Sequence, residues 1–246
     1  MSDLKIHQLL LLGLLAFSPT LSKAADAIPQ EGLVTHYSFE EKDGPVVQDA
    51  SPRKNQGRLI GGIKRVPGRI GQAVESNESD GFIAVSQNLA QWLGKTGSLS
   101  FWIKTETKGE ETNWLAPAVA GIEEVGGSDD CFWGWIDQNG KIGLQAGDGK
   151  SAKSKQPITD GKWHHVVLTR DMNNGAVKIY IDGKLDDEQR SDSGPKTFPF
   201  HSFGRRENTG GDLPCYKAAY DEIRVYNRVL MPEDVVALFK EAPAEK

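Results

Sequence analysis

Two adjacent histidines, His164 and His165, are the side chains in this sequence best suited to general base catalysis or metal binding. They lie in an alternating apolar run that is typical of a β-strand, where neighbouring side chains point to opposite faces. The two imidazoles therefore cannot bind one metal ion together. The sequence also lacks the Gly-x-Ser-x-Gly elbow of hydrolases, the His-Glu-x-x-His helix of zinc proteases and a phosphate-binding glycine loop. The sequence therefore contains none of these catalytic motifs.

Two tryptophans on one predicted strand form a second group of candidate residues. Residues 131–136 read CFWGWI. Strand alternation places Phe132 and Ile136 on one face, and Trp133 and Trp135 then lie on the opposite face. If the first pair faces the core of a two-sheet protein, both indoles stand on its outer, concave face.

Trp114 and Tyr216, on neighbouring loops, are expected to flank these indoles. Sugar rings stack their C–H faces on aromatic side chains, and their hydroxyl groups bind polar side chains. Residues 204–212 (GRRENTGGD), Asp129 and Asp130 supply such polar groups. Because large exposed aromatic side chains usually mark an interface, these residues predict a ligand-binding face. The alternative is that loops cover the tryptophans and make them a second, minor core.

The elements that must position these residues are short β-strands and one helix. From residue 32 onward, apolar residues alternate in short runs that Gly, Asn, Asp, Pro and Ser separate. The predicted strands are 33–39, 81–85, 98–104, 131–136, 141–146, 163–170, 176–181 and 220–226. Turns between strands account for the glycines from Gly57 to Gly71. Pro232 at the first position and acidic residues in the first turn predict a helix over residues 232–240.

Two connections predict antiparallel hairpins. Residues 137–140 (DQNG) and 171–175 (DMNNG) each join two predicted strands and offer the positive φ angles that tight turns need. Nothing in the sequence divides residues 28–241 with a repeat, a coiled coil or a low-complexity linker. We therefore predict one all-β, antiparallel two-sheet sandwich over residues 28–241, followed by a frayed tail, residues 242–246.

Composition excludes several classes of protein. The 246 residues include 34 acidic and 29 basic side chains, which gives a formal net charge of −5, and six tryptophans. This composition is that of a packed globular protein and not of a disordered chain. A mildly acidic balance without basic blocks argues against nucleic-acid binding. With two cysteines, the chain cannot form a four-cysteine zinc site.

The N-terminus predicts export. Residues 9–17 read LLLLGLLAF, Lys5 precedes this apolar run, and small residues follow it at positions 22 and 24. This pattern is typical of a secretory signal peptide, here residues 1–24, and the run is too short to span a membrane. We expect a secreted protein (extracellular, periplasmic or at the cell surface) without a membrane span.

Export changes the interpretation of the two cysteines. Outside the cytoplasm thiols tend to pair, so a disulfide between Cys131 and Cys215 is favoured. Both cysteines sit beside polar loops rich in Gly and Asp. The alternative is two buried free thiols.

Several motifs together resemble the laminin-G-like jelly rolls of the concanavalin A-like lectin and glucanase superfamily. The strongest are residues 161–170 (GKWHHVVLTR), residues 177–184 (VKIYIDGK) and residues 220–230 (YDEIRVYNRVL). Segments 37–40, 49–57, 71–73 and 98–104 also fit. The resemblance covers nearly all of residues 32–240 and implies a jelly-roll sandwich. This fold carries lectins, adhesion modules, hydrolases and lyases, so it predicts function only weakly.

The resemblance supplies further tests for catalysis. Glucanases of this fold carry a Glu-x-Asp-x-x-Glu strand, and that spacing is absent here. Asp221 and Glu222 are adjacent, so strand alternation predicts that they face opposite ways and do not act as a pair. Residues 216–220 (YKAAY) resemble the tyrosine strand of jelly-roll lyases only faintly. The resemblance implies that His164 and His165 are structural, one covered and one near the surface. We predict no catalytic residue.

The resemblance also implies a calcium ion. In related jelly rolls, an early turn and the final strand hold calcium, which here implies Asp49, Asn55 and Asp221 as ligands of a structural ion. Pro52 stands where the family usually has glycine. The alternative is an Asx turn at Asp49 and Asn55, with Asp221 in a salt bridge.

These observations predict a secreted, monomeric, non-catalytic module. We expect it to bind a carbohydrate or an extracellular protein on its concave face, and to bind no nucleic acid. The alternative is a polysaccharide lyase or glycoside hydrolase of the same superfamily with an atypical active site.

Overall fold

The structure is a computed structural model that describes residues 27–211 and 215–241. The predicted signal peptide (1–24) and tail (242–246) lie outside the described residues. The described chain is mostly β-strand, with one α-helix, α1 (Pro232–Phe239), and a short 3-10 helix, η2 (Leu89–Gln91). No helix in these two ranges combines the length and the hydropathy that crossing a bilayer requires.

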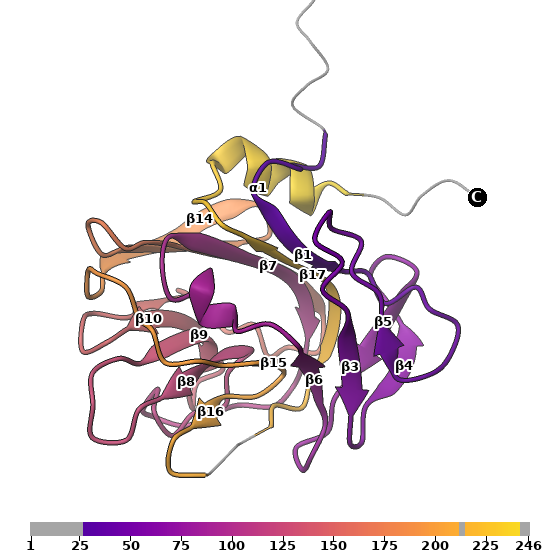
Figure 1. Ribbon diagram of the computed structural model, residues 1–246, viewed down its shortest axis with the longest axis horizontal. Helices are drawn as coiled ribbons and strands as arrows, with labels where there is room; N and C mark the ends of the chain where they lie inside the picture. Colours follow the sequence, from indigo (N-terminus) through magenta and orange to yellow (C-terminus); the bar gives the residue numbers. More distant parts are fainter. Residues whose placement is uncertain (1–26, 212–214, 242–246) are drawn as a thin grey trace, which may run out of the picture.

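The larger layer is an eight-stranded antiparallel sheet (Figure 1). Its strands, in spatial order, are β14 (Lys184–Arg190), β13 (Ala176–Ile181), β12 (Trp163–Asp171), β7 (Gly97–Lys104), β17 (Ala219–Tyr226), β5 (Gln72–Glu75) and β4 (Lys64–Pro67). β1 (Leu33–Tyr37) also pairs with β17. The central strands β12, β7 and β17 are those with the clearest apolar alternation, as expected for strands with a buried face.

The second layer consists of two smaller sheets. The five-stranded sheet contains β11 (Ala152–Lys153), β10 (Ile142–Ala146), β9 (Cys131–Ile136), β8 (Ala120–Glu123) and β16 (Glu207–Asn208). The four-stranded sheet contains β15 (Ser202–Phe203), β6 (Phe82–Val85), β3 (Gly57–Ile60) and β2 (Val46–Val47). Figure 1 shows the five-stranded sheet beneath β7 and β17, with β3 and β6 beside it. This arrangement confirms the predicted all-β jelly-roll sandwich.

The main core fills the space between the two layers. Leu99, Phe101 and Ile103 of β7 are fully buried in it, as the alternation of residues 98–104 predicts. Fully burying one such side chain contributes about 1.5–3 kcal/mol to stability. The core therefore fixes which face of each central strand points outward.

Helix α1 forms a second, smaller core on the outer face of the eight-stranded sheet (Figure 1). Its buried residues Val235 and Leu238 belong to one cluster with Val167 of β12 and Tyr226 of β17. The Asp234 carboxylate accepts a hydrogen bond from the backbone N–H of Met231, 2.9 Å away, and closes the first turn. This helix occupies the place that the sequence predicts.

The predicted strands are all present, but several others were missed, namely the short strands β2, β5, β8, β11, β15 and β16 and the strands of two further regions. β14 reads KLDDEQR and has one apolar residue, so hydrophobic periodicity does not reveal it. Charged residues are common on such an edge strand, because they discourage pairing with other chains. The glycine-rich stretch from Gly57 to Gly71, interpreted as turns, contains the strands β3 and β4.

Candidate binding site

A β-bulge at Gly134 separates the two tryptophans of β9. In the β9–β10 pair, Leu144 is opposite Trp133 and Gly143 is opposite Trp135, so Gly134 has no partner. Gly134 has a φ of 73°, a left-handed conformation that glycine adopts without strain. Because the extra residue breaks strict alternation, the two indoles do not share a face. The prediction of two tryptophans side by side on the outer face is wrong.

Trp133 lies in the main core, next to a cysteine. Its indole is 0% exposed, and its Nε1–H donates to the Cys131 sulfur, 2.9 Å away. Burial raises the pKa of Cys131 to about 11, so this thiol stays protonated. Cys131 and Cys215, both in the described part of the chain, are two separate buried thiols. The predicted disulfide is wrong, because the Cys131 side chain points into the core.

Trp135 lies outside the main core, but a loop covers it. Its side chain is 3% exposed and forms a small apolar cluster with Phe132, Ala116 and Ala118. The two alanines belong to the loop that precedes β8 and shield the indole from solvent. The alternative drawn from the sequence, a minor core beneath a loop, is therefore correct for Trp135.

Tyr216 is also buried. Its ring is 0% exposed, and its hydroxyl donates to the backbone carbonyl of Thr107, 2.8 Å away. Burial raises the pKa of Tyr216 well above its usual value, so its hydroxyl remains protonated near neutral pH. Tyr216 is therefore a structural residue, and its predicted contact with a ligand is wrong.

The loop that covers Trp135 presents two large apolar side chains to solvent. Trp114 is 52% exposed and Leu115 is 58% exposed. The backbone N–H groups of Leu115 and Ala116 both donate to the carbonyl of Thr112, which closes a turn at this point. Of the four aromatic residues predicted to contact a ligand, Trp114 is the one whose side chain is exposed to solvent.

Two of the polar side chains predicted to bind sugar hydroxyls make hydrogen bonds within the protein instead. Asp129 Oδ2 accepts hydrogen bonds from the backbone and hydroxyl of Thr197 and from the backbone of Phe198. Arg206 is 1% exposed, and its Nε–H donates to the carbonyl of Ala116. Arg206 therefore anchors the end of the Trp114 loop, which sequence reasoning did not anticipate.

The two adjacent histidines lie as the resemblance implies, one covered and one near the surface. His165 is 1% exposed, and its ring packs against Trp102, with centroids 5.1 Å apart. Burial lowers the pKa of His165 to about 3. His164 lies near the surface between Asp182 (3.0 Å) and Asp160 (3.1 Å). The hydrogen bond with Asp182 is the main reason that the pKa of His164 is raised.

A second bulge places Asp221 and Glu222 on the same face of β17. Asp221 is opposite Trp102 of β7 and Arg224 is opposite Ser100, so β17 has one extra residue between them. Glu222 has a φ of 51° and its carboxylate turns back to the Arg224 guanidinium. The prediction that these two carboxyl groups face opposite ways is wrong, because the bulge breaks alternation.

These carboxyl groups are nevertheless sealed from solvent. Asp221 is 0% exposed and Glu222 is 4% exposed. Glu222 also lies 2.6 Å from His36 Nε2, and Arg224 donates to Glu241 at the end of α1. Burial is the largest cause that raises the pKa of Asp221 to about 7. Neither carboxyl group is open to solvent among the described residues.

The residues predicted to bind calcium do not converge. Asp49 accepts four hydrogen bonds, from the backbone of His36, from the backbone and hydroxyl of Ser51 and from the backbone of Asn55. This is the Asx-type turn named as the alternative. Asp221 accepts from the backbone of Ile70 instead. Among residues 27–211 and 215–241, no three His, Cys, Asp or Glu side chains are grouped to hold a metal.

Calcium remains a prediction, with Asp221 as the residue to test. Its Oδ1 atom is buried and has no hydrogen-bond partner among the described residues. If calcium binds there, saturating calcium at 100 times its Kd should stabilise the protein by about 2.7 kcal/mol relative to EDTA. Asp221→Asn should abolish this response in a thermal melt. Asp187→Asn is the matched control, because Asp187 is not a predicted ligand and accepts a hydrogen bond from the backbone of Lys153. It should keep the calcium response of the wild type, and an unresponsive wild type would contradict the prediction.

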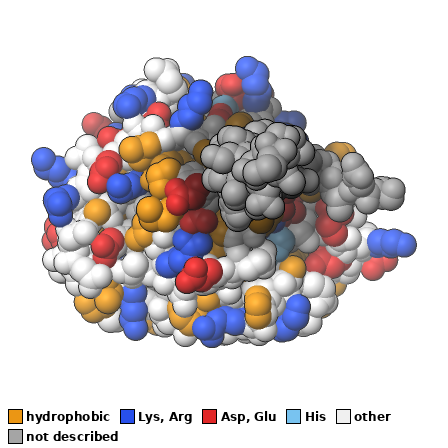
Figure 2. All heavy atoms as spheres, turned by 90° about the horizontal axis from the view of Figure 1, so that it is seen from above, with side chains coloured by type: hydrophobic (Ala, Val, Ile, Leu, Met, Phe, Trp, Pro, Cys, Tyr) orange, Lys and Arg blue, Asp and Glu red, His pale blue; other side chains and the backbone are white. Residues whose placement is uncertain are grey.

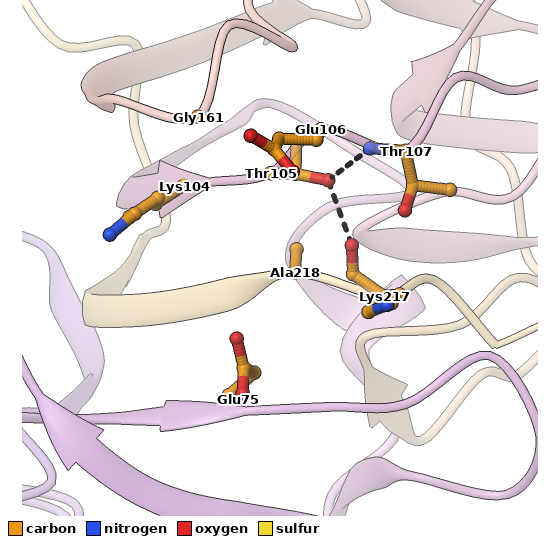
Figure 3. Close-up of a pocket in the computed structure, with 8 residues that line it drawn as sticks. All are labelled: Glu75, Lys104, Thr105, Glu106, Thr107, Gly161, Lys217 and Ala218. Carbon is orange, nitrogen blue, oxygen red and sulfur yellow. Dashed lines mark hydrogen bonds between the residues drawn. The ribbon is translucent and has the colours of Figure 1, made fainter.

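A polar groove opens where three strands of the large sheet end. Its volume is about 370 Å³, and Glu75, Lys104, Glu106 and Lys217 line it together with Thr105, Thr107, Gly161 and Ala218. Figure 3 shows the charged side chains around the groove, with lysine and glutamate alternating in position. Sequence reasoning missed this site, because its residues come from separate segments and carry no motif.

The surface above α1 shows no large area of one charge. In Figure 2, Lys and Arg side chains are interspersed with Asp and Glu side chains, and small apolar areas lie between them. A surface of this kind lacks the continuous basic stripe that phosphate backbones require.

Known proteins resemble the chain in sequence and in fold. Over 153 residues, it is 26% identical to Sushi, von Willebrand factor type A, EGF and pentraxin domain-containing protein 1 of Rattus norvegicus, a match to 59% of this chain and 4% of that protein. The corresponding protein of Mus musculus matches over the same length at 26% identity. The chain thus spans a small fraction of these relatives.

Solved structures resemble the fold over most of the chain. Trypanosoma rangeli sialidase matches 90% of this chain and 35% of its own, with a TM-score of 0.65 and 21% identity. The binding domain of botulinum neurotoxin serotype D/C matches 85% of this chain and 52% of its own, with a TM-score of 0.63 and 16% identity. At these identities, the likeness concerns the fold.

The family follows from the sequence match and the fold together. The model of the family Laminin_G_3, of the concanavalin A-like lectin/glucanases superfamily, matches residues 77–236, which is more than half of the chain. This range runs from the end of β5 to helix α1 and includes the strands β7, β12 and β17 that form the centre of the large sheet. The chain belongs to the Laminin_G_3 family of the concanavalin A-like lectin/glucanases superfamily.

Proposed function

We propose that the chain is a secreted, non-catalytic binding module that recognises a glycan through the loop carrying Trp114. The observation that carries this proposal is the exposure of Trp114 (52%) beside Leu115 (58%) on a loop tied down at its end by Arg206. An indole held in solvent exposes an apolar face on which a sugar ring can stack, and such exposed aromatic side chains usually mark an interface.

The neighbours in fold support a glycan as the ligand. One is a Trypanosoma rangeli sialidase in complex with sialic acid, and another is a binding domain of botulinum neurotoxin DC in complex with SialylT. Their likeness to this chain concerns the fold, so the ligand itself has to be tested. An extracellular protein partner is the outcome expected if no glycan binds.

The burial of the candidate catalytic groups supports a binding role. The Tyr216 hydroxyl donates a hydrogen bond to the protein backbone, and Asp221 and Glu222 are buried. A hydrolase or lyase needs its acid and base within hydrogen-bond reach of the substrate. Incubation with a panel of polysaccharides should therefore release no product, and cleavage of any of them would overturn the non-catalytic assignment.

Trp114→Ala is expected to weaken glycan binding about tenfold or more, because a tryptophan anchor at an interface usually contributes over 1 kcal/mol. The measurement is a glycan array, followed by titration calorimetry on the best ligand. Leu185→Ala is the matched control, since Leu185 is similarly exposed (51%) but lies on β14 at the edge of the large sheet. Equal affinity of Trp114→Ala and wild type would exclude this loop as the site.

A further inference from the structure

We propose that the polar groove at the ends of β5, β7 and β17 is a second binding site, which takes a small zwitterionic ligand. The groove is distinct from the Trp114 loop. Its charged side chains are Glu75, Lys104, Glu106 and Lys217. A zwitterion carries an ammonium and a carboxylate on one molecule, and each has a counterpart in this groove.

Strand register explains why the groove opens at this point. Ala219 of β17 is opposite Glu75 of β5 on one side and Lys104 of β7 on the other. Residues paired in this way share one face of the sheet, and Glu75 and Lys104 are two strand spacings apart, about 10 Å. Ala219 between them is 4% exposed, and the groove opens beside it, where Ala218 is one of the lining residues. A carboxylate and an ammonium therefore flank an opening.

The floor of the groove is fixed by hydrogen bonds. Thr105, which is 5% exposed, donates its hydroxyl to the Lys217 carbonyl (2.8 Å) and accepts from the Thr107 backbone (3.0 Å) (Figure 3). The Tyr216 hydroxyl holds Thr107 from the other side, and the Gly161 backbone donates to the Thr105 carbonyl. Preorganised walls reduce the entropy that a ligand has to overcome on binding.

Gly161 leaves room for one of the acidic groups. It has a φ of 74°, and a Cβ atom at this position would lie 2.9 Å from Glu106 Oε1. Any larger residue would push the Glu106 carboxylate away from the groove. Tyr216 and Gly161 thus both help to position the residues that line the groove.

The four charged groups are available to a ligand. Within the part of the chain that the structure describes, none of them makes an ion pair or a side-chain hydrogen bond. Figure 3 shows Lys104 and Lys217 on opposite sides, with Glu75 and Glu106 between them. A ligand with a single charge would meet attraction and repulsion in equal number, whereas a zwitterion can pair with both kinds of group.

The lining also excludes an apolar ligand. Ala218 and Gly161 are the small residues of the groove, and the other side chains are charged groups or threonines. A groove lined in this way favours a hydrophilic ligand, whose polar groups can take the place of the water molecules bound to the lining side chains. Two classes of zwitterionic ligand fit this description, a free α-amino acid and an amino sugar that carries a carboxylate.

The test compares zwitterions with ligands that keep one of their charges. By titration calorimetry, L-alanine is matched with ethylamine, which lacks the carboxylate, and propionate, which lacks the ammonium. Muramic acid is matched with glucosamine and N-acetylmuramic acid in the same way. We expect at least one zwitterion to bind about tenfold more tightly than either of its single-charge analogues, because each analogue lacks one of the two charge-assisted contacts. The better zwitterion identifies the source.

Substitutions locate the site. Lys104→Gln and Glu106→Gln should each weaken binding of the zwitterion about fivefold to tenfold. Lys178→Gln and Glu188→Gln, an exposed ion pair on β13 and β14, are the controls for loss of one charge and should leave the affinity unchanged. Absence of binding by both zwitterions, equal binding of the single-charge analogues, or indifference to the two groove substitutions would overturn the proposal. Glycan binding through Trp114 would be unaffected by that result.

Discussion

Arg170→Met is expected to lower the free energy of unfolding by about 3–5 kcal/mol, because it removes the donor of several buried backbone carbonyls at once. Arg170 is 0% exposed and lies on the inner side of β12. Its guanidinium donates to four backbone carbonyls, of Gly94 (3.0 Å), Lys95 (2.9 Å), Asp192 (3.1 Å) and Gly194 (2.6 Å). Methionine fills part of the volume but leaves the carbonyls of Lys95, Asp192 and Gly194 without their donor, whereas the Gly94 carbonyl keeps the backbone N–H of Lys196 (2.7 Å).

The effect should be large because these carbonyls belong to two loops, which are otherwise linked by a backbone hydrogen bond from Lys196 to the carbonyl of Gly94 (2.7 Å). One loop leads into β7, and the other follows β14. A buried carbonyl that loses its donor costs about 1–3 kcal/mol, and both loops would have to move to reach water. Arg170→Lys should recover little of the loss, because one ammonium group cannot reproduce the planar fork of a guanidinium.

Urea denaturation at neutral pH measures this effect. Arg190→Met is the matched control, because Arg190 is an exposed residue of β14 with one hydrogen bond, to the carbonyl of Asn174. We expect less than about 0.5 kcal/mol for the control, as is usual for exposed positions. A loss below about 1 kcal/mol for Arg170→Met would mean that the loops are satisfied by other donors or by water.

Apolar alternation predicts this fold well where strands pair without irregularity. For residues 98–104, alternation assigns Leu99, Phe101 and Ile103 to the core, and all three are fully buried. The same rule fails at β9 and β17, because a bulge at Gly134 and another at Glu222 each insert one residue. A glycine within a predicted strand is a warning of this kind, but the second bulge has no such signal.

The candidate sites were harder to predict, since burial of a loop residue depends on what packs over it. Trp114 and Trp135 were both predicted to contact a ligand, yet one is 52% exposed and the other 3%. The difference comes from Ala116 and Ala118, which cover Trp135. The polar groove shows a second limit. The residues of the groove meet because β5, β17 and β7 are neighbours in the sheet. Local sequence patterns do not predict this spatial order of the strands.

Acidification should destabilise the protein through His165. This ring is buried, and its pKa is lowered from 6.5 to about 3 in the folded state. Below pH 6.5 the unfolded chain therefore binds a proton that the folded chain rejects, so stability falls as the pH falls from about 6.5 towards 3. The loss from this group between pH 7 and pH 5 is about 2 kcal/mol, because each unit of pKa difference corresponds to about 1.4 kcal/mol.

The groups around His165 act in known directions. Burial lowers its pKa, the nearby Arg224 charge lowers it further, and Asp182 opposes this shift. Asp221 lies in the same row of the sheet, on the far side of Trp102. Its raised pKa gives the opposite trend, since a buried carboxylate is less costly once it is protonated. The difference between wild type and a His165 variant at each pH cancels this contribution.

His165→Gln should flatten the acid limb of the stability curve, whereas His164→Gln should make it steeper. The pKa of His164 is raised by its hydrogen bonds to Asp182 and Asp160. Its contribution to stability is therefore full below pH 6.5 and is lost as the pH rises through the folded pKa, so His164→Gln removes stability mainly at acidic pH. Chemical denaturation of the wild type and both variants from pH 5 to pH 8 measures the two slopes. The two substitutions should thus change the slope of unfolding free energy against pH in opposite directions. A change in the same direction for both variants would contradict the burial of His165 beneath α1.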